Sequence, residues 1–319
     1  MNFHGKDIKI FAGSSNLTVA KGIADGLGLP LGKSDCCTFS DGEIAISLNE
    51  SVRGSECFIV QSTCDPVNDN LMELLIMIDA MKRASAARIT AVMPYFGYAR
   101  QDRKAKPRDP ISAKLVADLI TTDGADRLLT MDLHANQIQG FFNIPVDHLL
   151  GAPLLARYMK EMVGTDKDDY IVVSPDLGSV TRARNFANKI GCGLAIVDKR
   201  RQRANVSEVM NIIGDVKDKK VILVDDMIDT AGTLCNAAAA LIERGGATSV
   251  TACATHAVLS GPAIERIKNS VISKVVLLDT VPVEGEKLID KFTVLPVAPT
   301  FARAIERIYA DQPFNNVFG

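Results

Sequence analysis

The sequence has no tryptophan, and aromatic residues of all kinds make up only 5% of its 319 residues. It also has no basic excess, since 36 Lys and Arg stand against 38 Asp and Glu, for a formal net charge of -2. Proteins that bind nucleic acids usually carry a basic excess or a basic stripe, so this balance favours a protein that binds small molecules. No run of 18 apolar residues occurs, and residues 1–13 carry scattered charges without an apolar core, so we expect neither a membrane span nor a secretion signal.

Cysteine is present, but in no pattern typical of a metal site. The seven cysteines are odd in number and include no pair separated by two residues. This arrangement indicates free thiols, which are usual in the reducing cytoplasm, and we therefore expect a cytoplasmic protein without disulfides. Hydrophobic residues make up 47% of the chain, which is enough for a folded protein, and the length suits two domains of about 150 residues each.

Short β-branched runs alternate with amphipathic stretches along the chain. Their hydrophobicity is mostly continuous, as in strands of a parallel sheet that is covered on both faces. We predict buried strands at residues 89–93, 127–132, 171–174, 194–198, 221–225, 250–255 and 275–279. Between them we expect helices, including one at 71–86 and one after Asp109 and Pro110, with Asp109 as its N-cap. The alternation predicts an α/β fold built from βαβ units.

The two halves of the chain resemble one another weakly. Residues 93–97, which lead to Arg100, are similar to residues 174–178, which lead to Arg182. Asp132 and Asp225 each end a predicted strand. These similarities suggest two related domains, with a boundary in the stretch 147–153, which contains Gly and Pro.

Residues 28–34, Gly-Leu-Pro-Leu-Gly-Lys-Ser, look at first like a P-loop. That motif needs four residues between its glycines, whereas three separate Gly28 from Gly32 and five separate Gly26 from Gly32. The segment also follows a predicted helix instead of a strand. We therefore predict a turn before a strand and no phosphate site here.

The segment 221–233 carries the strongest functional signal. An apolar strand runs into three acids and then into small and hydroxyl residues, followed by an Ala-rich helix at 234–243. Small residues allow backbone amides to approach a phosphate at a helix N-terminus, and paired carboxylates can accept sugar hydroxyls or organise Mg²⁺. The alternative is a tight turn with capping threonines, which accounts for Thr233 but not for the acids.

This segment resembles the ribose-phosphate fingerprint of the type I phosphoribosyltransferase fold. Over essentially its whole length the chain is similar to the phosphate-activated class of the ribose-phosphate pyrophosphokinase family, also called phosphoribosyl-pyrophosphate synthetases. The resemblance implies two tandem phosphoribosyltransferase-like domains, each a largely parallel sheet flanked by helices. Residues 1–148 would bind ATP, with the segment 302–319 returning to them, and residues 149–301 would bind ribose 5-phosphate.

The resemblance also assigns site residues, motif by motif. It implies ATP binding by Phe39, Asp41, Gly42, Glu43, Arg100 and Gln101, and catalysis by Lys199 and Arg201. It implies a ribose 5-phosphate site of Arg201, Asp225, Asp226, Asp229, Thr230, Ala231, Gly232 and Thr233. It implies a pyrophosphate loop of Asp176, Leu177, Gly178 and Ser179, with Mg²⁺ near His134 and Asp176.

Some of these motifs also have plainer interpretations. Residues 39–43 are typical of a surface turn, and the cations at 199–203 are typical of a solvated loop. The three aromatic residues at 95–98 favour a nucleotide site, because aromatics are scarce elsewhere. Ser179 stands where the family usually has a second glycine, and a side chain there would crowd an anion or force a strained φ. Gln202 replaces the usual proline.

The family's reaction transfers the β,γ-diphosphoryl group of MgATP to the 1-hydroxyl of ribose 5-phosphate, giving 5-phospho-α-D-ribose 1-diphosphate and AMP for nucleotide, His and Trp biosynthesis. The resemblance further implies hexamers, activation by phosphate and inhibition by ADP. Two alternatives remain open. A phosphoribosyltransferase would share residues 221–233 but need no ATP, and a non-catalytic regulatory relative would bind nucleotide without turnover.

Overall fold

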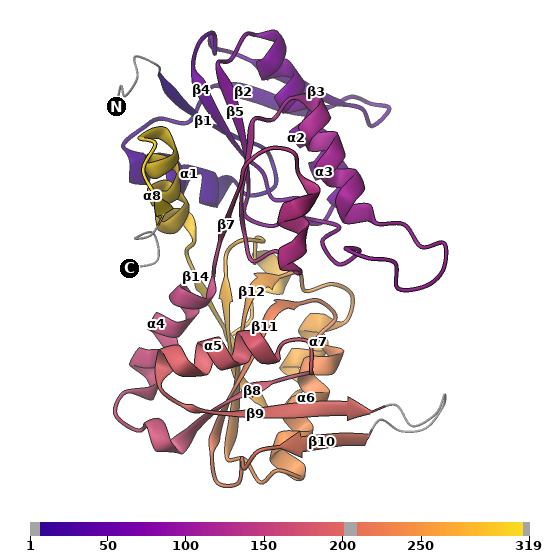
Figure 1. Cartoon of the computed structure of the whole chain (residues 1–319), viewed down its shortest axis with the longest axis vertical. Helices are drawn as coiled ribbons and strands as arrows, with labels where there is room; N and C mark the ends of the chain where they lie inside the picture. Colours follow the sequence, from indigo (N-terminus) through magenta and orange to yellow (C-terminus); the bar gives the residue numbers. More distant parts are fainter. Residues whose placement is uncertain (1–6, 201–208, 315–319) are drawn as a thin grey trace. The chain divides into compact units, whose positions relative to one another are not determined.

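The computed structural model describes residues 7–200 and 209–314. Among these residues the chain forms two compact units (Figure 1). Unit 1 contains residues 7–150, 280–282 and 296–314, and unit 2 contains residues 151–279 and 283–295. No helix within the described ranges is long and apolar enough to cross a membrane.

Unit 1 is built on a parallel sheet of five strands in the order β1-β4-β5-β6-β7. Its strands are β1 (Ile8–Ala12), β4 (Glu56–Val60), β5 (Arg88–Met93), β6 (Arg127–Met131) and β7 (Val146–Leu149). Its helices are α1 (Leu17–Leu27), α2 (Val67–Arg83), α3 (Ser112–Asp123), α8 (Ala298–Tyr309) and the 3-10 helix η1 (Asn136–Phe141). A separate antiparallel hairpin consists of β2 (Ser34–Thr38) and β3 (Ile44–Leu48).

The last helix of the chain, α8, packs against the first helix, α1 (Figure 1). Gly22 and Gly26 lie one turn apart on α1, and a Cβ atom at either position would meet Ala298 or Ala302 at 2.7 and 2.9 Å. The two glycines therefore allow the helices to approach closely. Phe301 and Ile305 on α8 are completely buried, so this contact belongs to the core of unit 1.

Unit 2 contains a seven-stranded sheet in the order β10-β9-β8-β11-β12-β13-β14, parallel except for the pairing of β9 with β10. Its strands are β8 (Tyr170–Ser174), β9 (Gly193–Arg200), β10 (Val209–Ile213), β11 (Lys220–Ile228), β12 (Ser249–Ala257), β13 (Ile272–Leu278) and β14 (Phe292–Leu295). Its helices are α4 (Ala152–Val163), α5 (Val180–Ile190), α6 (Gly232–Glu243) and α7 (Ala263–Lys268), with 3-10 turns η2 (Lys167–Asp169) and η3 (Gly285–Lys287).

All seven predicted strands are present, and the predicted α/β architecture is confirmed. Two strands continue further than the hydrophobic pattern indicates. β11 runs to Ile228 instead of ending at Asp225, because β12 stays paired with it as far as Ala257. β9 runs to Arg200 instead of Asp198, because it pairs with β10. The first helix that we placed between strands begins at Val67 and ends at Arg83, slightly earlier than predicted.

The predicted N-cap of α3 is wrong. The helix begins at Ser112, and its cap residue is Ile111, whose side chain makes no capping bond. The Asp109 carboxylate instead accepts a hydrogen bond from the backbone N–H of Lys106 at 2.8 Å. Asp side chains readily close such local turns, and this turn competes with the capping position that the sequence suggested.

The similar segments of the two halves follow corresponding strands of the two sheets. In unit 1, β5 pairs with β6, and residues 94–97 follow β5. In unit 2, β8 pairs with β11, and residues 175–178 follow β8. In both units a Pro-containing turn therefore follows a strand whose neighbour carries an acid at or near its carboxyl end, Asp132 just after β6 and Asp225 within β11.

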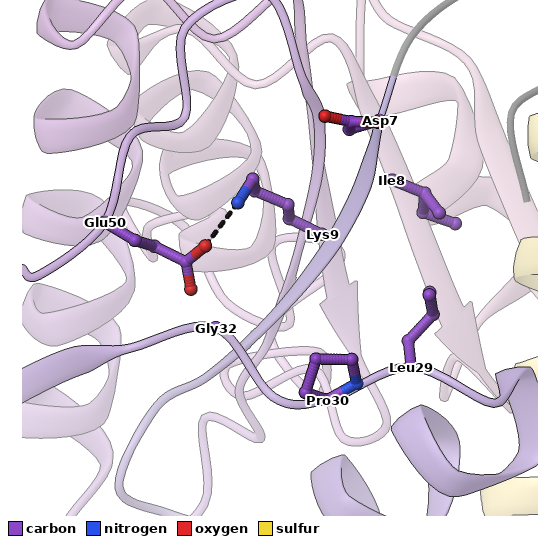
Figure 2. A pocket seen from close by; sticks show the side chains of 7 residues that line it. All are labelled: Asp7, Ile8, Lys9, Leu29, Pro30, Gly32 and Glu50. Atoms are coloured by element: carbon purple, nitrogen blue, oxygen red, sulfur yellow. Dashed lines mark hydrogen bonds and ion pairs between the residues drawn. The ribbon is translucent and has the colours of Figure 1, made fainter.

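The segment 28–34 is a turn before β2, as predicted, and its amides are used internally. The N–H of Gly32 donates to the carbonyl of Ile10 at 2.7 Å, and the N–H of Lys33 donates to Glu50 Oε1 at 2.7 Å. A small pocket of about 230 Å³ lies beside it, where Lys9 forms an ion pair with Glu50 (Figure 2). Asp7 adds a second carboxylate to its lining. Bonded amides and two acids make this a poor place for a phosphate.

Gly97 lies where two turns approach closely, so replacing it tests the packing of unit 1. Its N–H donates to Thr63 Oγ1 at 2.7 Å, and a Cβ atom here would lie 2.4 Å from the carbonyl oxygen of Thr63. We expect Gly97→Ala to lower the thermal midpoint by about 5 °C, the usual effect of overpacking in a domain of this size. Gly140→Ala is the matched control, since no atom lies within 4 Å of its Cβ position. Equal midpoints for the two variants in thermal unfolding followed by circular dichroism would contradict this packing.

Candidate active site

The first part of the candidate site is the loop that follows β8 in unit 2. Ser174 Oγ donates to the carbonyl of Asp176 at 2.7 Å, and Asp176 Oδ1 accepts the N–H of Ser179 at 2.8 Å. Ser179 is the N-cap of α5, with φ of -90° and ψ of 2°. The expectation that a side chain at position 179 forces a strained φ is therefore wrong, because φ is negative and lies outside the left-handed region that favours glycine.

The second part is a pair of carboxylates on β11. β8 pairs with β11 only as far as Leu223, so Asp225 and Asp226 lie beyond that pairing, next to the loop after β8. Ser179 Oγ donates to Asp225 Oδ1 at 3.1 Å, and the N–H of Asp226 donates to the same oxygen at 2.9 Å. The structure thus joins the predicted pyrophosphate loop to the predicted ribose site.

Arg182 balances the charge of this pair, a role that the sequence analysis did not assign. Its Nη1 atom lies 3.6 Å from Asp225 Oδ1 and 3.2 Å from Asp226 Oδ1. The available signal was the similarity between the two halves, which matched Arg182 with Arg100. A cation one turn into α5 compensates two neighbouring acids, of which Asp226 is only 4% exposed.

The Asp225 carboxyl group holds its proton more tightly than an ordinary aspartate. Burial and, to a smaller extent, the neighbouring Asp226 carboxylate raise its pKa from 3.8 to about 7, while Arg182 acts in the opposite direction. The ligand-free site therefore carries less negative charge near neutral pH than two free aspartates would. This arrangement reduces the repulsion that an incoming phosphate meets.

The third part is the N-terminus of α6, which begins at Gly232. Its cap residue, Ala231, has left-handed backbone angles, φ 58° and ψ 5°, and no side chain caps the helix. The alternative that Thr233 caps this helix is therefore wrong. Within the described residues, the amides of 230–233 donate no hydrogen bond to the protein. Such donors at a helix N-terminus form an anion-binding arrangement.

The residues assigned to ATP lie on two loops of unit 1. Phe39, Asp41, Gly42 and Glu43 form the turn between β2 and β3, where the N–H of Phe39 donates to the carbonyl of Glu43 at 2.8 Å. This is the surface turn that we held as the alternative, and Asp41 Oδ1 accepts the N–H of Glu43 within it at 3.2 Å. Phe39 is 57% exposed, which leaves its ring accessible for stacking.

The second ATP loop follows β5. Arg100 and Gln101 are exposed, and the carbonyl of Gln101 accepts the N–H of Ala113 at 3.2 Å, which fixes the loop to the start of α3. The aromatics just before them predict a nucleotide site, but the structure leaves only one of the three rings accessible for stacking. Tyr95 and Phe96 are buried, with Phe96 edge-on to another core ring, and of the three only Tyr98 is exposed.

The remaining predicted residues are placed as follows. His134 follows β6 in unit 1 and is exposed, whereas Asp176 lies in unit 2. Lys199 lies on β9 with its backbone opposite Met210, so it is part of a strand and not of the loop that we expected. Arg201 and Gln202 lie outside the described residues. The described ranges contain no group of three or more His, Cys, Asp or Glu side chains that could hold a metal ion.

The raised pKa of Asp225 predicts a specific pH dependence of stability in the ligand-free protein. Between pH 3.8 and about 7 the unfolded chain loses this proton before the folded chain does, so stability falls as the pH rises. Asp225→Asn removes this penalty and keeps an acceptor for Ser179. We expect its thermal midpoint to exceed that of the unmodified protein by about 4 °C at pH 8, with no difference at pH 4.

Asp290→Asn is the matched control, because Asp290 is an exposed carboxylate in the same unit. Its midpoint should follow that of the unmodified protein at both pH values. The thermal midpoint of Asp225→Asn minus that of this control is the quantity to compare at the two pH values. A smaller difference at pH 8 than at pH 4 would contradict the electrostatic interpretation.

Comparison with known proteins identifies the family. Residues 8–124 match the family of the N-terminal domain of ribose phosphate pyrophosphokinase, and residues 146–285 match the phosphoribosyl transferase domain. A protein of Clostridium perfringens (strain 13 / Type A) named ribose-phosphate pyrophosphokinase is 66% identical over 100% of this chain and 99% of its own length. The same name belongs to a protein of Clostridium tetani (strain Massachusetts / E88), 64% identical over 98% of both chains.

A solved structure agrees with these sequence matches. The crystal structure of phosphoribosylpyrophosphate synthetase from Mycobacterium smegmatis is similar with a TM-score of 0.91 and 43% identity, covering 96% of this chain and 100% of that one. Both units are therefore matched together in one known protein. The chain belongs to the ribose-phosphate pyrophosphokinase family.

Proposed function

We propose that this chain transfers the β,γ-diphosphoryl group of MgATP to the 1-hydroxyl of ribose 5-phosphate, giving 5-phospho-α-D-ribose 1-diphosphate and AMP. The observation that carries this proposal is the uncapped N-terminus of α6, immediately after a strand that bears two acids. A sugar phosphate fits both features, because its phosphate is an anion that the amides of 230–233 can bind and its hydroxyls can donate to the carboxylates of β11. The chain's membership in the family supports the same reaction.

The proposal gives each group of residues a distinct role. The phosphate of ribose 5-phosphate binds at Asp229, Thr230, Ala231, Gly232 and Thr233, while its hydroxyls bind at Asp225 and Asp226. The diphosphate binds along the loop of Asp176, Leu177, Gly178 and Ser179. ATP binds to the exposed ring of Phe39, to Asp41, Gly42 and Glu43, and to Arg100 and Gln101. A guanidinium group binds phosphate oxygens through two parallel hydrogen bonds, which suits Arg100 to this role.

Lys199 and Arg201 complete the proposed site as catalytic cations. Transfer of a phosphoryl-type group requires positioning and charge neutralisation more than covalent chemistry by the protein. Lys199 lies at the end of β9 in unit 2, and its ammonium group is the donor that we assign to the charge developing on the transferred group.

Mg²⁺ is the proposed cofactor, and one of its two assigned residues suits it well. Asp176 provides a carboxylate, and its Oδ1 accepts a backbone N–H, which orients the group. His134 is exposed, and because imidazole is a poor direct ligand for Mg²⁺ we assign it a contact through water. When bound, Mg²⁺ neutralises phosphate charge; the amides and cations of the chain perform the binding and orientation.

The assembly and regulation that the family resemblance implied belong to the same proposal. We infer a cytoplasmic homo-oligomer, a hexamer, that phosphate activates and ADP inhibits. The near balance of acidic and basic residues agrees with small-molecule ligands and with no nucleic-acid partner. Light scattering at several protein concentrations measures the assembly directly.

The reaction itself is tested by incubating the pure protein with ribose 5-phosphate, MgATP and inorganic phosphate. We expect AMP and a new sugar diphosphate, resolved by ³¹P NMR and nucleotide chromatography. The appearance of ADP in place of AMP would instead identify a simple kinase. Nucleotide binding without turnover would identify a non-catalytic relative. Transfer of the phosphoribosyl group of 5-phosphoribose 1-diphosphate to a base, with release of diphosphate and without ATP, would identify a phosphoribosyltransferase.

The role of Lys199 is tested by Lys199→Ala. Removing a donor that acts in the transition state should lower kcat at least about 10²-fold. Lys189→Ala is the control, because Lys189 is an exposed lysine on α5 of the same unit. Steady-state assays that find a kcat for Lys199→Ala within a factor of two of the control would remove Lys199 from catalysis.

A further inference from the structure

The segment 259–266, which follows β12, is bonded to the loop that follows β11. The N–H of Leu259 donates to the carbonyl of Ile228 at 2.9 Å, and the N–H of Ser260 donates to the carbonyl of Asp229 at 3.1 Å. Arg266 Nη1 donates to the next carbonyl, that of Thr230, at 2.9 Å. Three successive carbonyls, from the last residue of β11 and the first two residues of the loop, therefore face the same neighbouring segment.

This pattern determines where the amides of the loop point. In a trans peptide the C=O of one residue and the N–H of the next point in opposite directions. Because the carbonyl of Thr230 points toward Arg266, the N–H of Ala231 points away from it. The bond from Arg266 thus fixes the peptide plane that precedes the left-handed residue Ala231 and the first turn of α6.

The helix that carries Arg266 is itself held in place at two points. This helix is α7, in which Ala263 and Ile267 are completely buried. At the C-terminal end of α7, Lys291 Nζ donates to the carbonyls of Ile267, Lys268 and Ser270 at 2.9 to 3.0 Å. The helix is therefore anchored by its apolar face and by a lysine at its C-terminal end.

The guanidinium group also packs against the loop. A Cβ atom at Gly232 would lie 3.2 Å from Arg266 Nη1, so the absence of a side chain at Gly232 makes room for the arginine. Arg266 is exposed and lies on the lining of an open pocket of about 650 Å³ between α6 and α7. Its bond to Thr230 is thus a contact at the surface, and the core of unit 2 does not depend on it.

We propose that Arg266 is a positioning residue for the phosphate of ribose 5-phosphate: it holds the carbonyl of Thr230 so that the amides at the start of α6 face the anion. This inference rests on the proposed function, since it concerns the same loop. Arg266 acts through the backbone of residues 230–232 and needs no contact with the sugar phosphate itself. Ser260, which also donates through Oγ to Asp229 Oδ1, fixes the preceding part of the loop.

The test is a comparison of Arg266→Met and Arg266→Lys with the unmodified protein. For Arg266→Met we expect the KM for ribose 5-phosphate to rise about tenfold, which is the effect of losing one hydrogen bond from a charged donor. The KM for ATP should stay within a factor of two. Arg266→Lys keeps one charged donor and should recover part of the affinity. The thermal midpoints should stay within about 2 °C, because the side chain is exposed.

Arg244→Met is the matched control, because Arg244 is an exposed arginine at the other end of α6. Its two KM values should equal those of the unmodified protein. An unchanged KM for ribose 5-phosphate in Arg266→Met, or an equal rise in both KM values, would overturn the inference.

A calorimetric titration with ribose 5-phosphate alone separates this inference from the proposed reaction. We expect the Kd to rise about tenfold in Arg266→Met and to stay unchanged in Arg244→Met. If the unmodified protein binds ribose 5-phosphate with this dependence on Arg266 but forms no AMP, the proposed function fails and the inference holds. If AMP and the sugar diphosphate form but the Kd is insensitive to Arg266, the inference fails and the function holds.

Discussion

Two acids next to each other on β11 impose the main constraint on unit 2, because burying one carboxylate beside another is costly unless charge and hydrogen bonds compensate it. The compensation comes from the neighbouring loop and helix: Ser179 donates to Asp225, and Arg182 contacts both acids. The loop after β8 is therefore connected to the acids of β11. The same connection brings the proposed diphosphate and ribose sites together at one edge of the sheet, where ligands of open α/β folds bind.

The fold was largely predictable because a parallel sheet that is covered on both faces requires continuous apolar strands, and such runs are visible in sequence. Strand ends were less predictable, since they depend on the neighbouring strand. The predicted strand ends at Asp225, yet pairing with β12 continues β11 through Asp226 as far as Ile228. The cap of α3 was mispredicted for a similar reason, because Asp109 closes a local turn that only the folded backbone reveals.

Site residues that lie together in the sequence were predictable, whereas residues that reach the site from other elements were missed. The small residues at 230–233 indicate an anion site from their spacing alone, and the structure adds the left-handed Ala231 that leaves the helix uncapped. Arg182 and Arg266 reach the site from other elements, so no local pattern identifies them. Conversely, Tyr95 and Phe96 suggested a nucleotide and instead fill the core of unit 1, because scarce aromatics are also the best core residues. The roles of Lys199, His134 and Asp176 stay predictions.

In the proposed site, the amides at the start of α6 bind the phosphate of the sugar. Hydrogen–deuterium exchange measured with and without ribose 5-phosphate tests it most directly, since bound amides exchange more slowly. We expect added protection in peptides that cover residues 228–236, and none in peptides that cover residues 28–34, whose amides already donate within unit 1. Unchanged exchange at 228–236 under saturating ribose 5-phosphate, with protection appearing elsewhere, would contradict this assignment.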